Sequence, residues 1–320
     1  SGKSIVPLIS GTACAIPAIM ATRNIENWKE RLITILVTPF TTCSARLPVY
    51  AIIIALVIPD ERVFGIINMQ GLTLMLLYLL GFGMAIFSAY ILNTILKIKG
   101  KTYFVVEMPN YKLPMFKNVA INVIEKTKAF IFGAGKIILA ISIVLWFLAS
   151  YGPGDKFRNA EKIVLEKNLE KPLNTAELQN AIASQKLENS YIGLMGKTIE
   201  PVISPLGYDW KIGVAIISSF AAREVFVGTL ATIYSVGDSD NDNTIKNKMQ
   251  AEINPETGQK IFNFASGISL LLFYAFAMQC ASTIAITKKE TNSWKWPLGQ
   301  LIFMSGLAYV VALIAFQILK

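Results

Sequence analysis

Long apolar runs alternate with shorter polar segments along the whole chain. The apolar segments lie at 5–20, 32–58, 71–96, 129–150, 201–235, 261–287 and 297–318. A helix that crosses a bilayer needs about 20 mostly apolar residues, so this pattern predicts an all-α, polytopic membrane protein. Because the first segment is short and the fifth is long and interrupted, we expect six or seven segments to cross.

The polar segments predict which side of the membrane each connection occupies. Residues 97–128 contain seven lysines and two glutamates, which is typical of a cytoplasmic or interfacial segment under the positive-inside rule. Residues 151–200 form a long, nearly neutral polar loop that fits the outer side. Residues 236–260 have the Gly, Asp and Asn content of a flexible loop.

Composition agrees with a membrane location and excludes several function classes. Only 16% of the residues are charged, against about 25% in soluble domains. The net charge of +9 comes from basic residues beside the apolar segments, so nucleic acid is not expected as a partner. The chain has no histidine and shows no nucleophile–base pair, which argues against an enzyme. It begins at Ser1 without a methionine, and we expect it to be part of a longer protein.

The three cysteines all fall inside apolar segments, where free thiols are more plausible than disulfides. Cys14 stands three residues before Pro17, and a proline interrupts a helix and leaves a carbonyl one turn back without its donor. In lipid that carbonyl must meet protein, water or an ion. A thiol beside freed carbonyls predicts a mixed soft and hard ligand set, although a buried cysteine beside a kink is the simpler alternative.

The second cysteine lies in the most interrupted apolar segment. Pro39 and Pro48 bracket Cys43, while Ser44 and Arg46 follow the thiol. A charge at membrane depth costs at least about 2.5–3.5 kcal/mol and marks a pathway or a paired site. We favour a structural role for Arg46, as a partner of a carboxylate or as a cap on a broken helix, because a cation would repel a cationic cargo.

An internal echo links two of the apolar segments. Residues 41–46 read TTCSAR and residues 218–223 read SSFAAR, which indicates an inverted repeat of the kind that transporters use. Chance similarity between small-residue helices is the alternative. Arg223 and Glu224 close the second copy. We favour Glu224 as a counter-ion of an arginine, with a proton or metal station as the alternative.

The third cysteine, Cys280, follows Gln279 in an apolar run, where packing is the usual role of a lone cysteine. Three thiols in interrupted or polar segments nevertheless form a pattern. Thiolates suit copper, zinc and iron, whereas magnesium and calcium prefer oxygen ligands. A soft to borderline divalent cation is therefore the predicted cargo.

Five motifs resemble the membrane portion of the bacterial ferrous iron transport protein B family. In chain order they are GTACAIPAIMATR, RLITILVTPFTTCSARLPVY, YFVVEMPNYKLP, FAAREVFVGTL and KKETNSWKW. The resemblance runs from Gly2 to the last apolar segment and implies paired gate regions. It also implies that Cys14, Cys43 and Cys280 are the family's cysteine positions and hence metal ligands. The family usually has proline before the third cysteine, so Gln279 predicts a continuous helix around Cys280, with the amide oxygen as a substitute donor.

The resemblance implies the pore-forming part of a ferrous iron importer in the bacterial cytoplasmic membrane. Fe²⁺ is the expected cargo, no organic cofactor is expected, and GTP with Mg²⁺ belongs to an N-terminal G-protein domain outside this chain. The lipid bilayer, that domain, small cytosolic accessory proteins and further copies of the chain are the expected partners. A gate of the nucleoside-recognition type with another substrate, and a membrane scaffold or sensor that transports nothing, are the alternatives.

The expected organisation follows from these motifs. Residues 1–96 form a first gate region with a spanning helix, 97–128 the basic segment, 129–235 a second gate region, 236–260 a loop and 261–320 a helical hairpin. Cys14 and Cys43 are expected to meet where two broken helices approach each other, with carbonyls and hydroxyls completing a transient Fe²⁺ site. The residues expected to mark helix breaks or the translocation path are Pro17, Pro39, Ser44, Arg46, Pro48, Arg223, Glu224 and Gln279.

Overall fold

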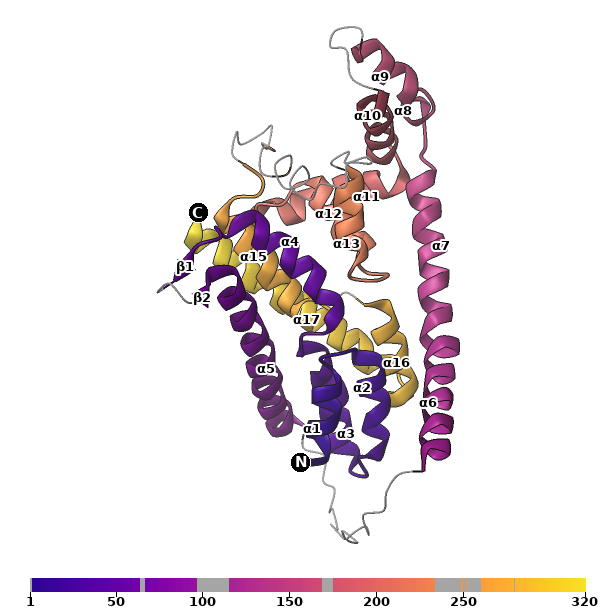
Figure 1. Ribbon diagram of the computed structural model, residues 1–320, viewed down its shortest axis with the longest axis vertical. Coiled ribbons are helices and arrows are strands. Elements are labelled where there is room, and N and C mark those ends of the chain that lie inside the picture. The colour runs from indigo at the N-terminus through magenta and orange to yellow at the C-terminus, as the bar shows by residue number, and fades with distance from the viewer. Residues whose placement is uncertain are drawn as a thin grey trace. The chain divides into compact units, whose positions relative to one another are not determined.

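The computed structural model describes most of the chain, and its described secondary structure is almost entirely helical (Figure 1). The described residues are 2–63, 67–96, 115–168, 175–233, 249, 252, 260–278 and 280–320. The helical class predicted from the apolar pattern is confirmed. The described strands are β1 (Arg62–Val63) and β2 (Ile67–Asn68), which pair antiparallel.

The chain folds into two compact units, each assembled from separate parts of the sequence. The first unit comprises residues 1–44, 80–140 and 281–300, and the second comprises 45–79, 141–280 and 301–320. The chain passes from one unit to the other within three continuous helices and at two further points, 44/45 and 280/281. The three helices are α5 (Met69–Ile95), α7 (Lys136–Ser150) and α17 (Lys295–Leu319).

The first unit is built from short helices around α2 (Figure 1). Besides parts of α5, α7 and α17, its elements are α1 (Gly2–Ser10), α2 (Ala15–Ala21), η1 (Thr22–Asn24), α3 (Trp28–Val37), η2 (Thr38–Phe40), α6 (Phe116–Phe130), the π-helical η4 (Ile131–Gly135) and α16 (Ala281–Thr291). Helix α2 packs against α1 and against α16. Ala18 and Ile19 of α2 and Leu32 of α3 are fully buried in this unit. The side chain of Asn27 accepts a hydrogen bond from Lys29 N and so begins α3.

The second unit has an aromatic and aliphatic core. Its elements are α4 (Leu47–Val57), α8 (Asp155–Arg158), α9 (Ala160–Asn168), α10 (Thr175–Glu188), α11 (Tyr191–Ile203), η5 (Ser204–Leu206), α12 (Trp210–Ser218), α13 (Val225–Ile233) and α15 (Phe264–Phe276). Phe226 of α13 lies against Tyr274 of α15, with ring centroids 4.8 Å apart. Tyr274 donates from its hydroxyl to Ser219 Oγ at 3.1 Å, so its polar end is satisfied inside the core.

Four stretches of the described chain are long and apolar enough to cross a membrane. They are Trp28–Val57, Met69–Ile95, Phe264–Thr291 and Lys295–Leu319. Segment 5–20 forms two short helices, α1 and α2, which are separated at Cys14. The predicted number of six or seven crossings remains a prediction, as does the division into five sequence regions.

Two predicted loops differ from expectation or lie outside the described residues. Residues 151–200 carry α8 to α11, because stretches such as TAELQNAIASQKLE have strong helix formers and Ser190 caps α11 by accepting from Gly193 N. The motif at 107–111, most of 236–260 and Gln279 lie outside the described residues.

Candidate functional site

The helix break predicted at Cys14 is present in the first unit. Helix α1 ends at Ser10 and α2 begins at Ala15, with Cys14 in extended conformation at φ −156° and ψ 136°. Pro17 lies in the first turn of α2, where a helix has no carbonyl partner for its N–H groups. The proline therefore marks the start of a helix rather than a kink inside one. Cys14 is half-buried and forms no disulfide.

The segment around Cys43 is interrupted more extensively. Helix α3 ends at Val37, and residues 41–43 are not helical. Pro39 lies at the start of η2, and Pro48 lies at the start of α4, again where a missing N–H costs little. Cys43 is likewise half-buried and forms no disulfide.

Hydrogen bonds within the first unit join these two breaks. Ser44 donates to Ala13 O from its hydroxyl at 2.8 Å and from its backbone N at 3.4 Å. Cys14 therefore follows, and Cys43 precedes, residues that are directly hydrogen-bonded to each other. The two segments that carry the cysteines therefore lie next to each other, as expected.

A close approach of Gly11 to Thr41 holds the same two segments together. A Cβ added to Gly11 would lie 2.5 Å from Thr41 Oγ1 and 3.0 Å from Leu8 O. Only a glycine allows the turn after α1 to pack this closely.

We predict that Gly11→Ala lowers the free energy of unfolding by about 1–3 kcal/mol, because the methyl group forces the segments apart. The loss of helical circular dichroism on heating measures this change. Gly83→Ala in α5 is the matched control, because a Cβ at Gly83 meets nothing within 4 Å. An equal midpoint for the two variants would contradict the close packing described.

The carbonyls freed at these breaks are occupied by side chains. Ser44 supplies two donors to Ala13 O, and a carbonyl oxygen has two lone pairs. Gln300 of α17 donates from Nε2 to Leu36 O at 2.8 Å, at the end of α3. These acceptors are therefore satisfied within the protein, and ligation of an ion at the breaks, by carbonyls or by thiols, stays a prediction.

The prediction of a continuous helix at Cys280 is wrong. Helix α15 ends at Phe276, Ala277 is extended at ψ 139°, and α16 begins at Ala281. Arg223 stabilises this break from within the second unit, because its guanidinium donates to Ala277 O at 2.9 Å and to Tyr274 O at 3.4 Å. A buried arginine thus satisfies carbonyls at the end of α15 without any proline in the break.

The repeat motifs both lie at interruptions between helices. Residues 41–46 separate α3 from α4, and residues 218–223 separate α12 from α13. Their arginines are both buried, Arg46 at 0% and Arg223 at 5% exposure. Glu224 is exposed, and in the described part of the chain its carboxylate forms an ion pair with neither arginine. The interpretation of Glu224 as their counter-ion is not supported by this arrangement.

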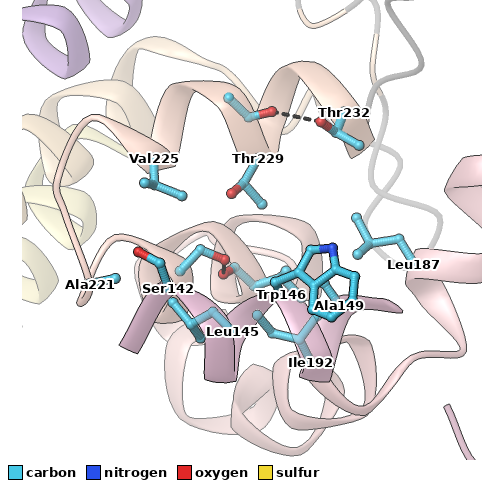
Figure 2. A pocket seen from close by; sticks show the side chains of 13 residues that line it. Ser142, Leu145, Trp146, Ala149, Leu187, Ile192, Ala221, Val225, Thr229 and Thr232 are labelled. Carbon is cyan, nitrogen blue, oxygen red and sulfur yellow. Dashed lines mark hydrogen bonds between the residues drawn. The ribbon is translucent and has the colours of Figure 1, made fainter. Parts of the chain in front are cut away.

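A separate pocket in the second unit has a volume of about 490 Å³ (Figure 2). Apolar side chains such as Leu145 and Ile192 line most of it, and Trp146 of α7 lies along one side. Thr229 projects into it from α13. Its other hydroxyl-bearing lining residues are Ser142, Ser218 and Thr232. This pocket could not be predicted from the sequence, because its residues come from segments that are distant along the chain.

Among the described residues, no group of three or more His, Cys, Asp or Glu side chains is placed to hold a metal ion. The cysteines therefore offer two adjacent sulfur-bearing segments rather than a closed cage. The interrupted helices, the apolar spans and the thiols at the breaks together define a multi-pass membrane protein with discontinuous helices.

Comparison with known proteins agrees with this class and narrows it. The sequence model of the Gate family, described as nucleoside recognition, matches residues 1–57 and 131–294, and that of the ferrous iron transport protein B C terminus matches 74–126. The chain therefore belongs to the Gate family, and its residues 74–126 are similar to the ferrous iron transport protein B C terminus. No solved structure matches the chain.

The similar proteins extend over nearly the whole chain. An Fe(2+) transporter FeoB from Leptospira interrogans is 44% identical over 318 residues, which is 99% of this chain and 43% of the relative. A FeoB from Helicobacter pylori is 32% identical over 98% of this chain and 48% of the relative. A fusion of Fe(2+) transport protein A with FeoB from Porphyromonas gingivalis is 35% identical, and this chain covers 38% of its length. The chain thus spans less than half the length of these relatives.

Proposed function

We propose that this chain is the ion-conducting membrane part of a ferrous iron importer in the bacterial cytoplasmic membrane. The observation that carries the proposal is the hydrogen-bonded junction of Ala13 and Ser44, which brings the segments of Cys14 and Cys43 together. The relatives named as Fe(2+) transporters support the choice of cargo.

The chemistry of the junction suits an ion that must be bound and released. Fe²⁺ accepts thiolate ligands, and Cys14 and Cys43 are both half-buried and form no disulfide. Ser44 is exposed, and its hydroxyl oxygen keeps acceptor lone pairs while its proton is donated to Ala13 O. Two thiols and one hydroxyl form a weaker site than a closed four-cysteine cage, and weak binding favours release along the path.

The proposal is tested by transport in liposomes that contain the purified chain. Fe²⁺ entry is followed with an iron-quenched dye inside the vesicles, and uridine entry is followed in parallel with radiolabel. Fe²⁺ flux above that of empty liposomes is the expected result. Uridine flux without Fe²⁺ flux would replace the proposal by its nucleoside alternative.

The nucleoside alternative has one specific observation in its favour. The 490 Å³ pocket offers an aromatic face at Trp146 and hydroxyls at Ser142 and Thr229, which are groups that stack on a base and bind a ribose. The description of the Gate family as nucleoside recognition points the same way.

We predict that Trp146→Ala leaves Fe²⁺ flux unchanged, because the pocket and the cysteine junction belong to different units of the chain. Leu145→Ala, which alters the same pocket without removing an aromatic ring, serves as its control. A selective loss of Fe²⁺ flux in Trp146→Ala would show that the pocket takes part in iron transport.

The partners follow from the same proposal. One relative is a fusion with Fe(2+) transport protein A, which favours a small accessory protein as a partner of this chain. A G-protein domain that uses GTP and Mg²⁺ and further copies of the chain complete the proposed set. In this proposal the chain itself catalyses no reaction.

A further inference from the structure

A buried carboxylate lies near the end of α16 in the first unit. The Glu290 side chain is 3% exposed. Its Oε1 accepts a hydrogen bond from Arg23 Nη2 at 2.6 Å. Both of its carboxylate oxygens accept from Arg23 Nε at 3.0 Å. Arg31 Nη2 adds a further bond at 2.7 Å. We call Arg23, Arg31 and Glu290 the arginine clasp.

The clasp joins three elements that are far apart in the sequence. Arg23 belongs to η1, Arg31 to α3 and Glu290 to α16, so the bonds span 267 and 259 residues. Fork-shaped contacts of arginine with a carboxylate fix direction as well as distance. Removal of one partner of a buried ion pair leaves an uncompensated charge, so the clasp resists changes in the position of α16.

The clasp also determines how α2 and α16 are aligned. The two helices pack against each other, and the clasp joins η1, which follows α2, to the last turn of α16. Arg23 is eight residues after Ala15, the first residue of α2, and Glu290 is nine after Ala281, the first of α16. At 1.5 Å per residue both helices extend back from the clasp by about 12–14 Å. The two helices therefore run in the same direction, each toward the clasp.

The first turn of each helix directly follows a cysteine: Cys14 precedes α2, and Cys280 precedes α16. We propose that Glu290 is a positioning residue, which holds α2 against α16 and thereby sets the placement of the Cys14 thiol at the start of α2. The inference rests on the proposed function, since it concerns how that thiol is presented to Fe²⁺. Glu290 acts through the helices and does not touch the ion.

The test measures protection of individual thiols from a maleimide by Fe²⁺ in membranes that contain the chain, with each cysteine peptide quantified by mass spectrometry. In Glu290→Gln the Fe²⁺ concentration that half-protects Cys14 is expected to rise about tenfold or more, as for other residues that orient metal ligands. Glu290→Asp, which retains the charge, is expected to recover part of the affinity. Glu26→Gln is the matched control, because Glu26 is 77% exposed in its ion pair with Lys3.

Arg23→Lys provides a second variant if Glu290→Gln fails to reach the membrane, because it retains the charge and loses the fork. It is expected to raise the same half-protection concentration. Wild-type protection in both variants would overturn the positioning role while Fe²⁺ flux in the wild type still upholds the proposed function. A wild-type chain with neither protection nor flux would overturn both.

Discussion

Replacement of both Cys14 and Cys43 by serine is expected to reduce Fe²⁺ flux at least tenfold at equal amounts of protein in the liposomes. The reason is chemical, because serine keeps the size and polarity of the side chain but offers a hard, protonated oxygen in place of a thiolate. Loss of a residue that only orients a metal ligand lowers metal affinity or activity by about 10–100-fold. Loss of two ligand atoms is therefore expected to lower the Fe²⁺ flux by at least as much.

The single variants show whether the two thiols bind one ion. If Cys14 and Cys43 share an ion, either single change removes most of the flux and the double change adds little, since coupled residues are not additive. Thr12→Ala is the matched control, because the Thr12 hydroxyl donates to Ile9 O at 2.7 Å and lies two residues from Cys14. Undiminished flux in the double variant, with vesicles proven tight, would remove the thiols from the mechanism.

The second large effect is expected at Arg223 and concerns stability. Arg223→Met removes the guanidinium that donates to Ala277 O at 2.9 Å and to Tyr274 O at 3.4 Å at the break before Cys280. Each buried acceptor left unsatisfied costs about 1–3 kcal/mol, so the free energy of unfolding should fall by about 3 kcal/mol. For a chain of 320 residues the midpoint of thermal unfolding in detergent should drop by about 4–5 °C.

Two further variants separate the hydrogen bonds from the charge. Arg223→Lys keeps the charge but has only one donor group, and an intermediate midpoint is expected. Arg158→Met is the control, because Arg158 is exposed at the end of α8. A midpoint for Arg223→Met equal to that of the control would mean that the break at 277–280 does not depend on Arg223.

The sequence alone predicted the features that depend on local chemistry. Pro17, Pro39 and Pro48 all lie at the beginning of a helical element, because proline has fixed backbone geometry and no N–H to donate. Two of the three cysteine breaks were therefore predictable without any knowledge of tertiary contacts. The apolar periodicity likewise predicted the helical class, because spanning segments are defined by their length.

The features that sequence did not reveal depend on long-range partners. The break before Cys280 has no local signal and is stabilised by Arg223, more than 50 residues away. Gln300 donates to Leu36 O from 264 residues away, and Glu290 is bound by Arg23 across 267 residues. Each is a polar residue in or beside an apolar run, and the sequence around it does not identify its partner.

The way in which the acceptors at these interruptions are satisfied has a consequence for a cell that lacks iron. Ser44, Gln300 and Arg223 donate to the carbonyl oxygens at these helix breaks, so these acceptors do not need a bound ion. Domains such as zinc fingers unfold when their metal is withdrawn, because the ion replaces a hydrophobic core. In this fold the hydrophobic core and the donors at the helix breaks come from the chain itself. If the proposed function holds, we expect the chain to remain folded when no Fe²⁺ is bound.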